Sequence, residues 1–183
     1  MSALLRFEQV ALRRGGRLLF EGLDLTLEAG EALLVRGPNG SGKSSLLRLA
    51  AGLLSAERGR VERAPLALAD ENDALDRELP LGRAMALWGG QTPDALDALG
   101  IAPLRDTPVR LLSSGQRKRA SLARVVGSAA LLWLLDEPLN ALDGDGAGRL
   151  ETAIARHLAG GGALLAASHQ PIGGIVRTRE LGA

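Results

Sequence analysis

A glycine-rich segment that ends in lysine and serine is the strongest chemical signal in this sequence. Residues 37–44 read Gly-Pro-Asn-Gly-Ser-Gly-Lys-Ser and fit the phosphate-loop pattern G-x-x-x-x-G-K-[ST]. Its glycines let backbone N–H groups turn inward around phosphates, and the helix that follows adds the positive end of its dipole. Lys43 would reach the β- and γ-phosphates, and the Ser44 hydroxyl would bind Mg²⁺. The segment predicts an ATP-binding site made of Gly37, Pro38, Asn39, Gly40, Ser41, Gly42, Lys43, Ser44 and Ser45.

Two adjacent acids follow an apolar run further along the chain. Residues 131–135 are apolar and lead directly into Asp136 and Glu137. Carboxylates at the end of a buried strand are unfavourable unless they meet a cation or hydrogen-bond donors. Beside a phosphate loop, Asp136 predicts a ligand of Mg²⁺, and Glu137 predicts the group that polarises the attacking water. Two alternatives stay open: a glycine-rich turn with an incidental lysine, and a solvated strand end with a helix-capping acid.

These segments need strands and helices that bring them together. Strands are predicted where apolar residues run or alternate, at 4–12, 18–20, 23–27, 32–36, 130–135 and 163–167. Helices are predicted where apolar residues recur at helical spacing, at 44–54, 79–88, 93–99, 116–126 and 148–158. Strands that alternate with helices favour a mainly parallel sheet with helices on both faces, here with an antiparallel edge from the first 30 or so residues. The expected fold class is α/β.

Composition excludes several classes of protein. The 183 residues suit one domain, and a net charge of +1 provides no strong field for nucleic acid or an anionic membrane. No cysteine is present, which removes disulfides and thiolate metal sites and fits a cytosolic setting. The most apolar run, 128–135, is far shorter than a bilayer requires, and the N-terminus lacks a signal-peptide pattern. We therefore expect another chain to supply any membrane part.

A third segment, Leu-Ser-Ser-Gly-Gln at 112–116, adds a second predicted anion site at a helix N-terminus, although alone it could be a capping box. In order, the sequences GPNGSGKS, LSSGQ, LLWLLDEP, NALD and SH resemble an ATPase of the ABC (ATP-binding cassette) class from end to end. The segment departs from the usual LSGGQ of that class only at Ser114, where a small residue still allows close approach to phosphate.

The resemblance implies a P-loop NTPase fold and an active site shared between two subunits. The signature residues Ser113, Ser114, Gly115 and Gln116 would face the ATP bound by a partner subunit, in a head-to-tail homodimer around two ATP molecules. Residues 139–143 resemble the D-loop, whose Asp143 would lie along the dimer seam. His169 resembles the switch histidine that contacts the γ-phosphate, so the resemblance makes it a catalytic residue beside Glu137.

Within this class, the chain is most similar to the ATP-binding subunit of the cytochrome c maturation haem exporter, the CcmA family. The likeness is carried by residues 18–53, by DEPLNALDGDGAGRL at 136–150, and by Ser-His-Gln-Pro at 168–171. It implies a peripheral protein on the cytoplasmic face of the inner (plasma) membrane, a separate CcmB-like permease as partner, and no nucleic acid. The haem cargo enters only through this resemblance.

Three features depart from the pattern of the class. The Q-loop glutamine should fall near Asn72, and an asparagine could still bind Mg²⁺ with shorter reach. The aromatic residue that stacks on adenine should fall near Arg14, whose guanidinium could stack on the base instead. The stretch between the phosphate loop and the signature is short, which predicts a reduced helical subdomain at about 72–128 beside a RecA-like core at about 1–71 and 129–183.

Other functions stay open beside a haem export ATPase. The chain could serve another ABC exporter, or it could be a soluble ABC ATPase that acts on DNA or ribosomes. Against the latter, there is one cassette, no heptad repeat and no basic arm. A nucleotide-binding module without turnover is the third possibility, which Lys43, Asp136, Glu137 and His169 oppose and Asn72 keeps open.

Overall fold

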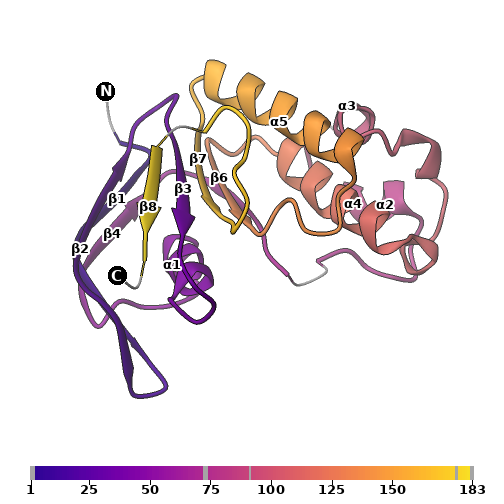
Figure 1. The fold of residues 1–183 in the computed structure, drawn as a ribbon. Helices are drawn as coiled ribbons and strands as arrows, with labels where there is room; N and C mark the ends of the chain where they lie inside the picture. Colours follow the sequence, from indigo (N-terminus) through magenta and orange to yellow (C-terminus); the bar gives the residue numbers. More distant parts are fainter. Residues whose placement is uncertain (1–2, 72–73, 91, 176, 182–183) are drawn as a thin grey trace.

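The computed structural model describes residues 3–71, 74–90, 92–175 and 177–181, and its centre is a five-stranded parallel sheet (Figure 1). The strand order is β5-β6-β7-β3-β8. These strands are β3 (Ala32–Arg36), β5 (Leu66–Ala69), β6 (Leu132–Asp136), β7 (Ala163–Ala167) and β8 (Arg177–Glu180). All neighbours in this sheet pair in parallel, so their carboxyl ends meet at one edge. The loops that follow β3, β6 and β7 carry the predicted site residues.

A second, antiparallel sheet has the order β2-β1-β4. It consists of β1 (Leu5–Arg14), β2 (Arg17–Leu27) and β4 (Arg58–Arg63). Gly15 and Gly16 both have positive φ and form the two-residue turn between β1 and β2, as this tight hairpin geometry requires. The antiparallel edge expected from the first 30 residues is present, and β4 extends it.

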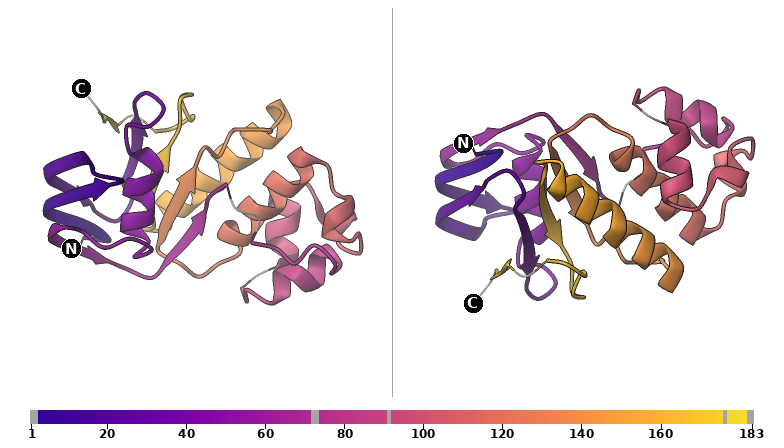
Figure 2. Two further views of the ribbon diagram at one scale, coloured as in Figure 1. Left: turned by 90° about the horizontal axis from the view of Figure 1, so that it is seen from below. Right: turned by 90° about the horizontal axis from the view of Figure 1, so that it is seen from above.

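The described residues contain five α-helices, and Figure 2 shows how they are arranged. They are α1 (Lys43–Ala50), α2 (Leu81–Ala86), α3 (Thr92–Ala98), α4 (Ser114–Val126) and α5 (Gly144–Ala159), with 3₁₀ turns at Ala102–Leu104 and Val109–Leu111. In both views α2, α3 and α4 gather at the end of the molecule away from the antiparallel sheet.

Alternate residues of the buried strands belong to two hydrophobic clusters, which lie on opposite faces of the parallel sheet. Along β6, Leu132 and Leu134 join the cluster that contains α1 and the antiparallel sheet. Trp133 and Leu135 join the other cluster, with α5 and the helices α2 to α4. Because side chains alternate between faces along a strand, both faces of β6 are apolar, as expected for a parallel sheet covered by helices.

The strand predicted as two pieces, 18–20 and 23–27, is one strand, which corrects that prediction. Gly22 has positive φ (62°), and the opposite strand has a register irregularity at Gln9, also at positive φ (46°). Gln9 donates its backbone N–H to Asp24 Oδ1 at 2.7 Å. Gly22 and Asp24 therefore lie within an irregular but continuous pairing, where the sequence had suggested a turn.

The helix predicted over 44–54 ends earlier, at Ala50, because Gly52 adopts positive φ (77°). Three further strands, β4, β5 and β8, are not among those predicted from the sequence. β4 and β8 are mostly polar, as Arg-Gly-Arg-Val-Glu-Arg and Arg-Thr-Arg-Glu, so they lack the apolar alternation that marks a half-buried strand. β5 has only four residues.

His157 stacks face to face on Trp133, with ring centroids 3.9 Å apart and planes within 9°. The imidazole lies in the last turn of α5, and its Nε2 is 3.2 Å from the Ala163 carbonyl oxygen. Burial lowers the pKa of His157, and hydrogen bonds to the backbone oppose that effect. The neutral ring is therefore the form that this site favours.

Acid should destabilise the fold through His157. As pH falls below the ordinary value of 6.5, the unfolded chain binds a proton before the folded chain does. Stability is complete above that value and is lost as pH falls toward the lower folded-state pKa. Urea unfolding at about pH 7.5 and about pH 5.5 measures this change. His157→Gln should reduce this loss of stability. If His157→Gln and the unmodified chain lose the same stability between these two pH values, His157 is not the residue responsible.

Candidate functional site

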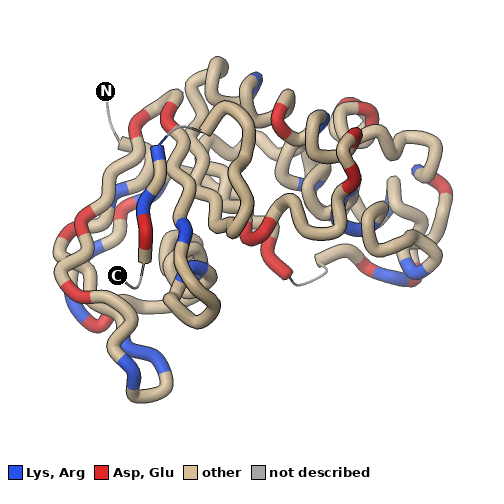
Figure 3. Tube along the Cα trace, in the orientation of Figure 1, with Lys and Arg blue, Asp and Glu red and all other residues tan. Residues whose placement is uncertain are grey.

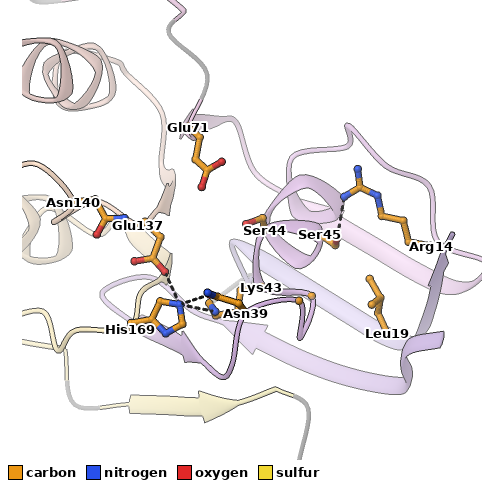
Figure 4. A pocket seen from close by; sticks show the side chains of 12 residues that line it. Arg14, Leu19, Asn39, Lys43, Ser44, Ser45, Glu71, Glu137, Asn140 and His169 are labelled. Atoms are coloured by element: carbon orange, nitrogen blue, oxygen red, sulfur yellow. Dashed lines mark hydrogen bonds and ion pairs between the residues drawn. The ribbon is translucent and has the colours of Figure 1, made fainter. Parts of the chain in front are cut away.

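A pocket of about 540 Å³ lies at the carboxyl ends of the parallel strands (Figure 4). The loop after β3, the acid after β6 and the histidine after β7 all reach it. Its lining residues are Arg14, Leu19, Asn39, Gly40, Gly42, Lys43, Ser44, Ser45, Glu71, Glu137, Asn140 and His169. The carboxyl edge of a parallel sheet is where open α/β folds bind ligands.

The loop between β3 and α1 has the backbone expected of a phosphate cradle. Gly37, Gly40 and Gly42 have φ of 143°, 79° and 103°. A Cβ on Gly37 would clash with the Leu181 carbonyl, so only glycine fits there. Gly42 is the N-cap of α1 and provides no side-chain acceptor to the first N–H groups of the helix. Those donors suit an anionic ligand.

Lys43 extends from the first turn of α1 beneath this loop and is only 7% exposed. Its Nζ donates to the Gly37 carbonyl at 2.8 Å and to the Pro38 carbonyl at 3.3 Å, and lies 3.2 Å from His169 Nε2. The ammonium is therefore held in the pocket by backbone carbonyls, next to the N–H groups of the loop.

His169 is the meeting point of the three loops, as the dashed lines in Figure 4 show. Its Nε2 lies 3.0 Å from Asn39 Oδ1 and 3.5 Å from Glu137 Oε1, in addition to the contact with Lys43. The two oxygens can accept a proton from Nε2, whereas the Lys43 ammonium can only donate to it. The structure thus brings Lys43, Glu137 and His169 together in one pocket.

Asp136, the last residue of β6, is 2% exposed, and its Oδ1 has no hydrogen-bond partner among the described residues. Burial raises the pKa of Asp136, while the hydrogen bond from Ser44 acts in the opposite direction. A buried carboxylate oxygen without a partner, beside a serine hydroxyl, is the donor set of a hard cation. The residues present fit a Mg²⁺ ion.

Glu137 has a left-handed backbone (φ 43°), which is rare for a residue with a side chain. Its N–H donates to the Ala167 carbonyl at 2.8 Å, which joins the ends of β6 and β7. This bond fixes where the side chain leaves the backbone, and Glu137 lines the pocket beside His169. Backbone strain of this kind concentrates at functional sites.

The signature segment lies elsewhere in the same chain. Ser113 is the N-cap of α4 and forms a capping box with Gln116: Ser113 Oγ accepts from Gln116 N at 3.2 Å, and Gln116 Oε1 accepts from Ser113 N at 2.8 Å. Ser113, Gly115 and Gln116 line a separate pocket of about 310 Å³, and Ser114 lines a third one beside Glu137. None of the four lines the pocket that contains Lys43.

Asp143 forms a hydrogen bond and an ion pair within its own chain. Its Oδ1 accepts from Gly146 N at 2.8 Å as the N-cap of α5, and it also pairs with Arg119. The hydrogen bond from the Gly146 backbone and then that from Arg119 lower the pKa of Asp143. The D-loop acid is therefore ionised and helps to set the start of α5.

The residues expected at the adenine-stacking and Q-loop positions, Arg14 and Asn72, have different outcomes. Arg14 lines the pocket close to the tip of the β1–β2 hairpin, where Figure 3 shows a basic segment, and its Nη1 donates to Ser45 Oγ at 3.3 Å. Asn72 lies outside the described residues, so its predicted role at the metal stays a prediction. Its neighbour Glu71 does line the pocket.

Four residues at or near this site are not among the site residues predicted from the sequence. Leu19, Glu71 and Asn140 line the pocket, and Lys118 donates from α4 to the Asp136 carbonyl at 3.3 Å. Burial lowers the pKa of Lys118, against the opposing effect of the nearby acids, led by Asp136. Asn140 follows the paired acids closely, which is a usable signal, whereas nothing in the sequence indicates where Leu19 or Lys118 lies.

A phosphate loop between β3 and α1, paired acids at the end of β6 and the LSSGQ signature at the start of α4 together define an ATP-binding protein of the ABC class. Residues 20–140 match the ABC transporter family. The fold is similar to a solved ATP-binding subunit of an ABC transporter (TM-score 0.84, 20% identity, covering 91% of this chain and 79% of that one). It is also similar to an ABC transporter ATP-binding protein from Pyrococcus furiosus (TM-score 0.83, 21% identity, 97% and 96% covered).

Its relatives narrow the class further. The chain is 52% identical to the cytochrome c biogenesis ATP-binding export protein CcmA of Sphingopyxis alaskensis, over 92% of this chain and 91% of the relative. It is 51% identical to the protein of that name from Novosphingobium aromaticivorans, over 94% and 91%. The chain therefore belongs to the CcmA family of cytochrome c biogenesis ATP-binding export proteins. In the described part of the chain, no helix has the length and apolarity to cross a bilayer.

Proposed function

We propose that this chain hydrolyses ATP in the pocket around Lys43 and thereby drives an export step of cytochrome c biogenesis, with haem as the cargo. One observation carries the catalytic part: Lys43 Nζ and Glu137 Oε1 both lie within 3.5 Å of His169 Nε2. A phosphate-binding cation, a candidate base and a candidate phosphate-sensing imidazole thus occupy one pocket. The export step is supported by the relatives' names, and the haem cargo is supported by the family resemblance alone.

Each residue has a proposed task. Lys43 and the first N–H groups of α1 hold the phosphates, and Arg14 with Leu19 holds the base. Ser44 and Asp136 hold Mg²⁺, which when bound neutralises charge on the phosphates. Glu137 orients the attacking water and accepts its proton, because its carboxylate is fixed at the strand end beside the phosphate loop. His169 donates a ring N–H toward the terminal phosphate.

The signature requires a second subunit. Ser113 and Gly115 line a pocket separate from the one that contains Lys43. If both anion sites serve one γ-phosphate, the signature must come from another copy of the chain. A head-to-tail homodimer then forms two equal composite sites, each enclosing one ATP. Much of that interface is ligand, so dimerisation should depend on nucleotide.

A membrane subunit resembling CcmB is the proposed partner, which places the chain on the cytoplasmic face of the inner membrane. The surface that suits it is a groove of about 440 Å³ between β5 and the end of α2. Leu53 (62% exposed) and Trp88 (53% exposed) line it, and Arg124 lies over the Trp88 ring at 4.4 Å. A half-exposed indole beside apolar side chains suits a partner helix. The helical part at about 72–128 would act as the docking arm.

Genetic complementation tests this function. A strain that lacks the chain should fail to attach haem to its c-type cytochromes, and the wild-type chain should restore attachment, read by haem staining of separated proteins. Glu137→Gln should not restore it. If the purified chain hydrolyses Mg²⁺-ATP normally but the deletion strain makes normal c-type cytochromes, the ATPase assignment stands and the haem export assignment fails.

A further inference from the structure

A partly buried guanidinium connects the signature helix to the D-loop. Arg119 lies on α4, six residues after the N-cap Ser113, and its side chain is only 12% exposed. Nη1 donates to the Leu99 carbonyl at 3.2 Å and to Asp145 Oδ2 at 2.9 Å, and Nη2 pairs with Asp143 Oδ1. One side chain therefore joins α4, the turn after α3 and the first turn of α5.

The signature and the D-loop, which Arg119 connects, also contact each other directly. A Cβ built on Gly115 would lie 2.9 Å from the Ala141 carbonyl, so the signature glycine packs directly on the D-loop backbone. Arg119, Ser113, Gly115, Ala141 and Asp143 all line the same pocket. The signature, the D-loop and Arg119 thus form one continuous part of the pocket wall.

Charge and geometry suit Arg119 to this position. Its two carboxylate partners, Asp143 and Asp145, both have a lowered pKa, to which hydrogen bonds from Arg119 contribute. Arg149 is the other cation in the cluster and contacts Asp145 alone of the two acids, with Nε 2.9 Å from Oδ2. A planar guanidinium can donate to a carbonyl and two carboxylates at once, which an ammonium does with less fixed direction.

We propose that Arg119 is a positioning residue that holds the signature (112–116) and the D-loop (139–143) as one rigid unit facing the partner's nucleotide. This inference rests on the proposed composite site. A preorganised donor set binds its anion without first being ordered, so the rigid unit strengthens nucleotide-dependent dimerisation. Arg119 does not line the Lys43 pocket, so the nucleotide affinity of a single subunit should not depend on it.

Dimerisation tests the proposal in a chain that already carries Glu137→Gln, which we expect to retain ATP. Adding Arg119→Ala should raise the dimer dissociation constant in Mg²⁺-ATP by about tenfold, measured by sedimentation. The affinity of the monomer for a fluorescent ATP analogue should change by less than about twofold. Arg149→Ala is the matched control, because it removes a cation from the same cluster without touching α4 or Asp143, and it should leave dimerisation unchanged.

A second measurement keeps the test independent of dimer formation. Amide hydrogen exchange of the nucleotide-free monomer should become faster at 112–116 and 139–146 in Arg119→Ala, and should stay unchanged in Arg149→Ala. Arg119→Lys, which keeps the charge, should be intermediate and serves if the alanine variant does not fold. Equal exchange and equal dimerisation in the Arg119 and Arg149 variants would overturn the proposal. If the parent Glu137→Gln stays monomeric, the composite site fails, and the exchange data alone decide the role of Arg119.

Discussion

Replacing Glu137 by glutamine should lower the rate of ATP hydrolysis by about 100-fold or more, the usual contribution of a general base. Glutamine keeps the size and the neutral hydrogen bonds of the side chain, but it cannot accept the proton of the attacking water. The phosphate-binding groups on the loop and on Lys43 stay in place, so ATP binding should be retained. Phosphate release by the purified chain and nucleotide binding by fluorescence measure the two effects separately.

The same variant should accumulate as a dimer in Mg²⁺-ATP, because a closed dimer that cannot hydrolyse its nucleotide does not reopen. Light scattering should show a monomer without nucleotide and a dimer with it. Glu62→Gln is the control, since Glu62 is exposed on β4 and does not line this pocket, so this variant should not accumulate as a dimer. Glu137 is not the base if its glutamine variant turns over ATP at the wild-type rate.

Replacing Lys43 by alanine should weaken ATP binding itself, by about 10- to 100-fold, since a charge-assisted hydrogen bond contributes about 1.5–3 kcal/mol. Lys43 is 7% exposed and its ammonium is held beneath the loop by the Gly37 and Pro38 carbonyls. The variant loses a positioned cation next to the phosphates. Titration with a fluorescent ATP analogue measures the change in dissociation constant.

Lys43→Arg serves as the control for charge alone. It keeps the positive charge, but a planar guanidinium does not fit a space closed by two carbonyls and His169. We expect it to bind ATP nearly as weakly as the alanine variant. Circular dichroism and thermal unfolding should show that Lys43→Ala is folded. If the folded variant binds ATP with wild-type affinity, Lys43 does not contact the phosphates.

Local rules were enough to predict the main elements that carry the site. The apolar strands at 32–36 and 163–167 are present with those bounds, and the predicted strand at 130–135 is β6, displaced by a residue or two. The glycines of the phosphate loop adopt the positive φ values that their type permits. These features depend on neighbours in sequence, so composition and spacing reveal them. Polar edge strands such as β4 and β8 were missed, because their pairing partners and not their own side chains make them strands.

By itself, the sequence determined the phosphate loop, the paired acids and the order of the motifs, since each depends on residue type and local spacing. Only the tertiary structure decided how they meet. His169 lies 126 positions from Lys43 yet is 3.2 Å from its ammonium, because β3 and β7 are neighbours in the sheet. Arg119 contacts the carboxylates of Asp143 and Asp145, 24 and 26 positions away, for the same kind of reason. Such contacts arise from sheet order and helix packing, and these long-range arrangements leave no periodic trace in the chain.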